Sequence, residues 1–297
     1  MILKKSDKNR SIEARRSGLN VLYHYTSLET AFKILENKEL WASRIQCMND
    51  GSENQYLASI IKPSILEIEE FADYGEWGTF YRDTLLNMLD NGSKHPDYVI
   101  SFSEKSDDLS QWRAYSGNGT GCAIGFEATW LNSLDTEEIF PDLLRHLSFE
   151  PCDYDPQSHH EMIQEVLQAI REYLESPIRD EDGNLEHQAL LNSQRALETY
   201  HKRAASFKHP AFVDEAEWRI IMRRNKGRDA KYRTRKSLIV PYLTLPLDSG
   251  EGNSVIAIDI GPNPHPELNH RLMKEFVENN SFNHVHVYSS AIPYRDW

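Results

Sequence analysis

The sequence is poor in the residues that build disulfides, cysteine metal sites and membrane spans. Its 297 residues include three cysteines, Cys47, Cys122 and Cys152, and no CxxC pair. An odd number of widely spaced cysteines predicts no disulfide framework and fits a reducing cytosol. No stretch approaches the roughly 18 consecutive apolar residues of a transmembrane helix, and the charged start lacks the apolar core of an export signal. We therefore expect a cytoplasmic protein without a membrane partner.

Basic residues are also outnumbered. The chain has 33 lysines and arginines against 46 aspartates and glutamates, a formal net charge of −13 at pH 7. Such a balance repels phosphate backbones and disfavours a general duplex-binding role. The exception is the segment 219–236, whose basic residues are Arg219, Arg223, Arg224, Lys226, Arg228, Lys231, Arg233, Arg235 and Lys236. Two interpretations stay open: a solvated basic hairpin, or a docking surface for an anionic partner.

The sequence signatures of common cofactor sites are missing as well. No GxGxxG follows a predicted strand and no GxxxxGK[ST] is present, so hydride transfer to a nicotinamide and P-loop chemistry are disfavoured. The histidines are scattered and form no metal-ligand pattern with carboxylates or cysteines. We therefore predict no metal site.

The sequence does contain short strand and helix patterns typical of an α+β domain. Strands are predicted near 19–26, 41–45, 98–103, 121–126, 216–222, 237–243, 255–260 and 284–288. Helices are predicted after the N-cap Ser27, through 57–66, and over 76–90, 158–175, 186–206 and 266–279. The segment 157–207 has the character of a helical insertion between two halves of one domain, 19–156 and 208–297, after an N-terminal extension, 1–18. We expect a mixed or antiparallel sheet with peripheral helices.

Two strands carry polar residues that suggest a binding site. His24 stands in an otherwise apolar strand that leads directly into a helix, where a ligand-binding histidine is well placed. Ser101 and Ser103 flank Phe102, so their hydroxyls fall on one face of a later strand. A structural role in the core explains each of these residues as well.

A third strand carries paired carboxylates. Alternation places Glu215, Glu217 and Arg219 on one face. If that face is exposed to solvent, the pattern is an ordinary amphipathic strand. If it faces a cleft, two carboxylates about 7 Å apart beside an arginine can accept ribose hydroxyls and stabilise positive charge. Arg219 neutralising Glu217 is a further explanation.

The connector 109–120 joins large side chains to a glycine-rich end. It contains Trp112 and Tyr115, so we expect it to pack over a cleft or to form part of one.

Six short motifs in the sequence resemble those of the bacterial proteins grouped as the domain of unknown function DUF2971. In order, they are Tyr-His-Tyr-Thr-Ser, Met-Asn-Asp-x-x-Glu, Ser-Phe-Ser-Glu, Ser-Gln-Trp-Arg-Ala-Tyr-x-Gly, Glu-x-Glu-Trp-Arg-Ile and Ile-Gly-Pro. The resemblance runs from about residue 20 to the end of the chain. It implies a family without implying a function.

More remotely, the order His, Ser-x-Ser, Glu-x-Glu is similar to the three-part signature of ADP-ribosyltransferases. The resemblance implies a split sheet of that fold and NAD as the substrate. Glu217 would stabilise the cation that forms as nicotinamide leaves, Glu215 would position or deprotonate the acceptor, and His24 would bind NAD. The implied NAD-binding residues are His24, Tyr25, Ser101, Ser103, Trp112, Tyr115 and Arg219. Among these, Tyr25, Trp112 and Tyr115 are the candidates to stack on a ring, and core aromatics otherwise.

We therefore expect an NAD-dependent ADP-ribosyltransferase, or an NAD glycohydrolase, that modifies a macromolecular acceptor. A role as a bacterial toxin or defence effector follows by analogy alone. The rival hypothesis is a non-catalytic nucleotide- or protein-binding module of the same fold. The acceptor, a homo-oligomer and a cognate inhibitor stay open.

Overall fold

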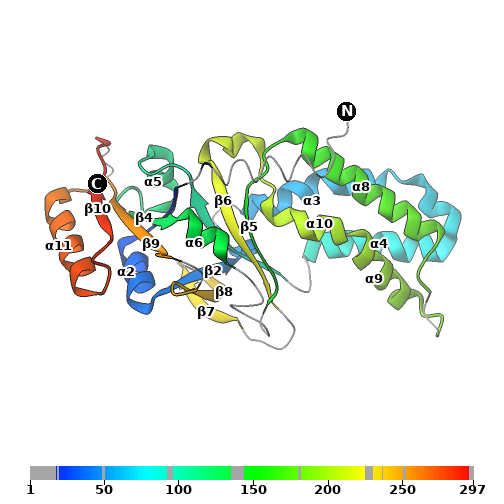
Figure 1. Ribbon diagram of the computed structural model, residues 1–297. Helices are drawn as coiled ribbons and strands as arrows, with labels where there is room; N and C mark the ends of the chain where they lie inside the picture. The colour runs from blue at the N-terminus through cyan, green and yellow to red at the C-terminus, as the bar shows by residue number, and fades with distance from the viewer. Residues whose placement is uncertain are drawn as a thin grey trace. The chain divides into compact units, whose positions relative to one another are not determined.

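The computed structural model describes residues 18, 20–48, 51–91, 96–134, 144–179, 182–224, 230–235, 237–249 and 252–293. The chain divides into two units (Figure 1). The first unit is formed by the chain up to Ser43, by Tyr98–Cys152 and by the chain from Val213 onward. The second is formed by Arg44–Asp97 and Asp153–Phe212.

The first unit contains the sheet. Its strands are β1 (Val21–Thr26), β2 (Glu39–Arg44), β3 (Asp97–Ser103), β4 (Cys122–Glu127), β5 (Leu144–Pro151), β6 (Glu217–Arg224), β7 (Lys231–Arg235), β8 (Leu238–Pro246), β9 (Val255–Ile260) and β10 (His286–Ser289). Its helices are α2 (Leu28–Asn37), α5 (Leu109–Tyr115), α6 (Ala128–Ser133) and α11 (Pro266–Asn279). The 3₁₀ helix η4 (Pro210–Glu215) begins in the second unit and ends in the first, which resumes at Val213.

The sheet is mixed and it divides at β3. Its main path runs β10-β9-β4-β1-β3-β2-β8-β7, and β6 pairs with both β3 and β5. The β9–β10 pair is parallel, whereas β1 pairs antiparallel with β3 and β4. Since a strand has only two edges, the three partners of β3 require two strands to share one edge. The mixed sheet and its helices confirm the α+β class.

The core of this unit covers one face of the sheet. Leu22, Phe102, Ile124 and Trp218 come from four strands and belong to one buried cluster. Helix α2 adds Ala31, Ile34 and Leu35 to that cluster. As predicted, Ser27 caps α2, because its hydroxyl accepts the backbone amide of Thr30 at 3.2 Å. Side chains that alternate with this core point to the other face of the sheet.

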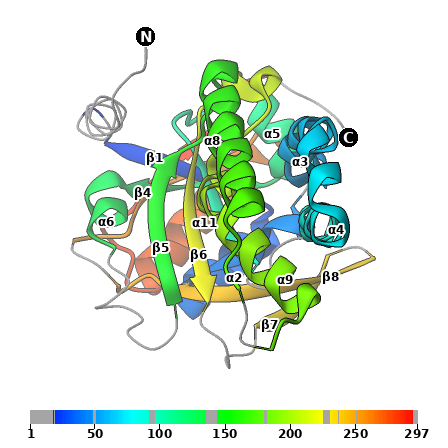
Figure 2. The same cartoon turned by 90° about the vertical axis from the view of Figure 1, so that its right-hand side faces the viewer.

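The second unit is helical. It contains η1 (Ile45–Cys47), α3 (Gly51–Leu66), η2 (Glu69–Tyr74), α4 (Gly75–Asn91), α8 (Pro156–Glu175), α9 (Leu185–Ala196), α10 (Glu198–Arg203) and η3 (Ala204–Ser206), most of which are labelled in Figures 1 and 2. The predicted helices of 157–207 are therefore present. They share a buried core with α3 and α4 that includes Ile61, Leu85, Val166 and Ile170. Pro63 lies inside α3 and does not end it.

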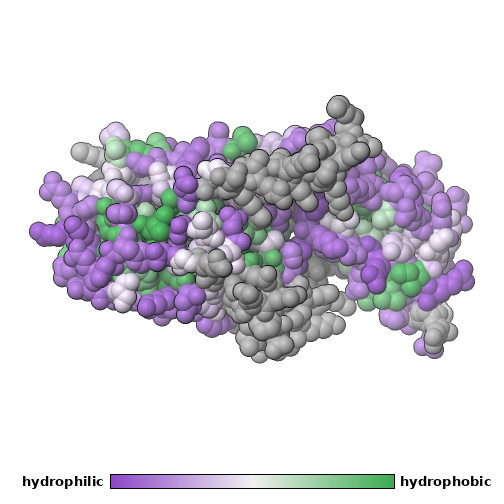
Figure 3. Space-filling model, viewed as in Figure 1, coloured by the Kyte–Doolittle hydropathy of each residue, from purple (hydrophilic) through white to green (hydrophobic). Residues whose placement is uncertain are grey.

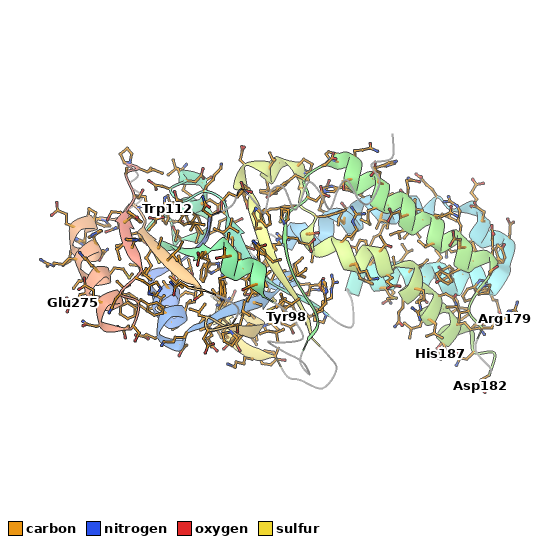
Figure 4. All side chains as sticks on the ribbon, viewed as in Figure 1. Tyr98, Trp112, Arg179, Asp182, His187 and Glu275 are labelled. Carbon is orange, nitrogen blue, oxygen red and sulfur yellow. The ribbon has the colours of Figure 1, made fainter. Side chains whose placement is uncertain are left out.

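One end of this helical unit carries polar residues. Arg179, Asp182 and His187 lie where α8 gives way to α9, as labelled in Figure 4. The face seen in Figure 3 carries hydrophobic side chains in patches among hydrophilic ones. None of the helices in the described part of the chain is long and apolar enough to cross a membrane.

Some predicted elements differ from the observed ones. The strand expected to begin at 216 begins at Glu217, because Ala216 has a left-handed backbone with φ of 45°. Glu215 therefore ends η4 and does not continue the strand face of Glu217 and Arg219, which corrects the expected arrangement. Strands β5 and β7 were not predicted. In β7, sparse apolar residues among basic ones hide the strand pattern.

Candidate functional site

Tyr115 and Glu215 meet although a hundred residues separate them. The Tyr115 hydroxyl lies 3.1 Å from each carboxylate oxygen of Glu215. Both side chains are half-buried, so the carboxylate is held without being sealed from solvent. Tyr115 ends α5, whereas Glu215 ends η4.

The backbone around Glu215 is fixed by the end of β3. The Ser103 hydroxyl donates to the Glu215 carbonyl oxygen at 2.7 Å, and the Glu104 amide donates to the Ala216 carbonyl at 3.2 Å. A third hydrogen bond joins the two segments, because the indole NH of Trp218 donates to the Glu104 carboxylate at 2.7 Å. A non-glycine residue in the left-handed region costs about 1 kcal/mol or more, and such strain often marks a functional turn. Hydrogen bonds from the end of β3 therefore hold the turn at Ala216, and the turn directs the Glu215 side chain toward Tyr115.

Tyr25 and Trp112 form the packed support beside this pair. Their rings meet edge to face with centroids 4.7 Å apart. Trp112, labelled in Figure 4, has no exposed surface, and Tyr25 is 7% exposed. In this structure neither ring has a free face for stacking on a ligand, so both are core aromatics. Tyr115 packs against the same cluster and stays half-buried.

The glycines near α5 allow a close backbone approach. The amide of Gly261 donates to the carbonyl of Gly121 at 2.9 Å. A Cβ on Gly261 would lie 2.4 Å from the carbonyl oxygen of Gly119 and 3.0 Å from Trp112. This contact explains why the Ile-Gly-Pro motif has glycine at its centre.

Glu217 and Arg219 form a buried ion pair. Arg219 donates to Glu217 from Nε at 2.7 Å and from Nη2 at 3.2 Å. Glu217 is 5% exposed and Arg219 is 1% exposed. The carboxylate that the sequence favoured as catalytic is thus neutralised and positioned by its neighbour along the strand.

His24 lies on the opposite face of the sheet from Glu217. Its ring packs 5.9 Å from that of Phe102, which belongs to the core cluster, whereas Glu217 alternates with the core residue Trp218. His24 Nδ1 is 2.9 Å from the Ser101 carbonyl oxygen. Burial lowers the pKa of His24, although the Ser101 hydrogen bond opposes that effect. The structure therefore joins His24 to β3 and does not bring its ring to Glu217.

Ser101 lies where β1 leaves β3. Among the described residues, these strands pair at one position, Tyr23 with Ser103. The Ser101 hydroxyl is buried, and no described residue forms a hydrogen bond with it. Ser101 and Ser103 thus differ: Ser103 anchors the turn at Glu215, while Ser101 presents a buried polar atom at the division of the sheet.

The basic segment 219–236 does not act as one surface in the described residues. Arg219 is buried, while Lys231, Arg233 and Arg235 alternate along β7 in a hairpin with β8. Arg233 donates to Ser43 at 2.7 Å and lies over the ring of Trp41. Lys226, Arg228 and Lys236 lie outside the described residues, as do Asn49 and Asp50 of the Met-Asn-Asp motif.

Several residues that build the site were not proposed as site residues from sequence. Glu104 accepts the indole NH of Trp218, and Asp107 accepts the indole NH of Trp112, each at 2.7 Å. Asp108 caps α5 by accepting two backbone amides. The signal that could have found them is the acidic run directly after a buried strand, which is a common place for binding residues.

Comparison with known families places this site inside a recognised sequence unit. Residues 111–220 match the model described as "Protein of unknown function (DUF2971)". The matched range includes Trp112, Tyr115, Glu215 and Glu217, and it confirms the family resemblance over that part of the chain. No curated protein and no solved structure matches the chain.

Proposed function

For a chain whose residues 111–220 match the DUF2971 family, we propose an NAD-using enzyme of the ADP-ribosyltransferase type. Glu215 would be its reacting carboxylate. The observation that carries this proposal is the half-buried Glu215 carboxylate, held by Tyr115 and by the left-handed turn at Ala216. A fixed carboxylate of this kind suits a reaction in which positive charge develops.

The local charge favours the nicotinamide end of NAD. Asp107 and Asp108 directly precede α5, whose last residue, Tyr115, contacts Glu215. Lys105 already pairs with Asp108 at 3.3 Å. An acidic environment attracts the cationic nicotinamide ring and disfavours the diphosphate, which would extend away from Glu215.

The division of the sheet at β3 supports the fold-level part of the proposal. The expected ADP-ribosyltransferase fold has a split sheet, and here β3 has three strand partners. His24 and the unpartnered Ser101 hydroxyl lie at that division. These two polar groups are candidates to contact a part of NAD remote from Glu215.

The proposed chemistry is heterolytic cleavage of the glycosidic bond. The C1′–N bond breaks and its electron pair leaves with nicotinamide, so the ribose becomes an oxocarbenium-like cation. Glu215 stabilises that cation by accepting the 2′-hydroxyl hydrogen bond. An acceptor nucleophile then bonds to C1′ and releases its proton to a carboxylate or to solvent. With water as the nucleophile, the product is ADP-ribose.

Glu217 would hold β6 in position and would not contact the reacting atoms of NAD. Its bidentate pair with Arg219 leaves little free charge for a ribose cation. We assign it as a positioning residue for β6, whose first residue directly follows the turn at Ala216.

The non-catalytic binding module remains the second candidate because of one observation. His24 and Glu217 lie on opposite faces of the sheet, so the three predicted motif residues do not surround one ligand. A module would need the Tyr115–Glu215 pair only for recognition of a nucleoside or a partner.

The test is release of nicotinamide from NAD by purified protein, with and without cell lysate. Wild type should release nicotinamide, and Glu215→Gln should lower the rate by about 100-fold, the usual scale for an electrostatic group at the reacting centre. Glu275→Gln, on the exposed side of α11 and labelled in Figure 4, is the matched control. Release that needs lysate indicates a transferase, and lysate-independent release indicates a glycohydrolase. No release in any condition would favour the binding module.

A further inference from the structure

A row of residues crosses four strands on the sheet face opposite the main core. Tyr25 pairs with Ala123, Ala123 pairs with Asp259, and Asp259 pairs with Tyr288. Asp259 alternates with Ile258 and Ile260, which belong to the core cluster, so its carboxylate points to this opposite face.

The floor beside Asp259 is made of small residues. The neighbouring row contains Tyr23, Gly125 and Ala257. A Cβ on Gly125 would lie 2.9 Å from the Ala257 Cβ and 3.2 Å from Cε1 of Tyr23. The Tyr23 ring therefore lies close over Gly125, between β1 and the strand that carries Asp259.

The Asp259 carboxylate is buried without a donor. It is 8% exposed, and no described residue donates a hydrogen bond to it or forms an ion pair with it. Burying an uncompensated carboxylate is costly, because desolvation disfavours its charged form. Burial and the nearby Asp107 carboxylate raise the pKa of Asp259 from 3.8 to about 7.

The second carboxylate near Asp259 is held rigidly. Asp107 accepts the Trp112 indole NH at 2.7 Å, the Ser290 hydroxyl at 2.6 Å and the Ala291 amide at 3.0 Å. Its own hydrogen bonds are therefore made within the protein, while its charge adds to that of Asp259. A ligand that stabilises these two neighbouring carboxylates must carry positive charge.

Within the described part of the chain, the other titratable groups near Asp259 do not supply that charge. They are Tyr23 and Tyr25 of β1 and Tyr288 of β10, while Cys122 of β4 lies nearby on the core face of the sheet. Burial raises the pKa of Cys122 to about 12 and raises that of Tyr23 above its ordinary value of 10.0, so both are neutral near pH 7. Lys105 pairs with Asp108.

We propose that Asp259, with Asp107 and the ring of Tyr23, forms a binding site for a primary alkylammonium group. The buried carboxylate supplies the counter-charge, and the ring of Tyr23, which lies over Gly125, contacts the alkyl chain and the cation. The ammonium group can come from a free amine or from a lysine side chain. This site goes beyond the proposed use of NAD and does not depend on it.

The experiment is calorimetric titration of the full chain with n-butylammonium, n-butanol and n-butyrate at pH 8 and pH 6. Butylammonium should bind, and at pH 8 it should bind about tenfold more tightly than at pH 6, since Asp259 ionises between these values. Butanol and butyrate should bind at least tenfold more weakly. Nα-acetyl-lysine methylamide, compared with butylammonium, distinguishes a lysine ligand from a free amine.

Two variants localise the effect. Asp259→Asn should remove both the binding and its pH dependence, whereas Asp248→Asn, at an exposed site, should change neither. The comparison of butylammonium with butanol on wild type needs no variant, so the proposal stays testable if Asp259→Asn fails to fold. Equal affinity for the two compounds, or no binding of butylammonium at pH 8, would overturn it.

Discussion

The hydroxyl of Tyr115 lies 3.1 Å from both carboxylate oxygens of Glu215, which joins the end of α5 to the turn before β6. This contact brings together two short motifs that lie largely within the matched residues 111–220. It depends on Ala216, whose left-handed backbone separates the directions of Glu215 and Glu217. Glu215 thereby lies at a half-buried position beside Tyr115, and Glu217 lies in a buried ion pair with Arg219.

Removing the Tyr115 hydroxyl should loosen Glu215. Tyr115→Phe keeps the ring packing and deletes one hydrogen bond to a charged group, worth about 1.5–3 kcal/mol when buried and less at this half-buried position. We expect NAD cleavage to fall by about tenfold while the free energy of unfolding changes by about 1 kcal/mol. Steady-state kinetics and urea denaturation measure the two effects. Unchanged turnover in Tyr115→Phe would contradict the role given to this contact.

Arg219 should be important for stability. Arg219→Ala removes both hydrogen bonds that Arg219 donates to the buried Glu217 carboxylate, and breaking such a buried pair costs about 3–5 kcal/mol. Urea denaturation should show this loss, and Arg271→Ala, at an exposed position of α11, should change stability by less than about 0.5 kcal/mol. Adding Glu217→Gln to Arg219→Ala should restore part of the loss, because the double variant buries no carboxylate charge at this position. A loss of less than about 1 kcal/mol in the free energy of unfolding would contradict the burial of the Glu217–Arg219 pair.

Because His24 resists protonation in the folded state, the free energy of unfolding should fall in mild acid. Burial lowers the pKa of the folded-state ring below its ordinary value of 6.5, so the unfolded chain binds a proton first as the pH falls. Its contribution is therefore present above about pH 6.5 and is lost below it. The urea midpoint should drop between pH 7.5 and pH 5.5, and this drop should be smaller in His24→Asn. The exposed His286→Asn variant is the control, and an equal drop in all three proteins would exclude His24 as the cause.

Asp259 should change the pH dependence of stability in the opposite direction to His24. Its folded-state pKa of about 7 exceeds the ordinary value of 3.8, so the folded protein holds this proton longer than the unfolded chain does. Stability should fall as the pH rises from about 4 to about 7, because the buried carboxyl then ionises. Asp259→Asn should raise the free energy of unfolding by about 1–3 kcal/mol at pH 8 and by much less at pH 5, after a discount for partial exposure. A variant less stable than wild type at pH 8 would contradict this account.

The parts of the fold that depend on local pattern were predictable from the sequence. Ser27 caps α2 as expected, and β1, β3, β4 and β9 lie close to their predicted ranges, because alternation and capping are local signals. The turn at Ala216 was not predictable, since alanine is not a residue that favours a left-handed backbone. Without that turn, Glu215 and Glu217 would share a face.

The site itself was only partly predictable. Tyr115, Ser103 and Glu215 were named from sequence and do come together. Asp259 was not named, because a single aspartate in an apolar strand carries no motif. Its significance comes from the small residues and the acid placed around it by the sheet register. The separation of His24 from Glu217 likewise follows from strand pairing between distant segments.

The most direct test is the rate of nicotinamide release per enzyme for Glu215→Gln beside Glu217→Gln, at saturating NAD. The account predicts that Glu215→Gln loses about 100-fold in kcat with its fold intact, because a group acting at the reacting centre affects the chemical step. Glu217→Gln should lose activity mainly in step with its loss of stability. Full activity in Glu215→Gln, or a selective loss of kcat in a stable Glu217→Gln, would contradict the assignment of Glu215 as the reacting carboxylate.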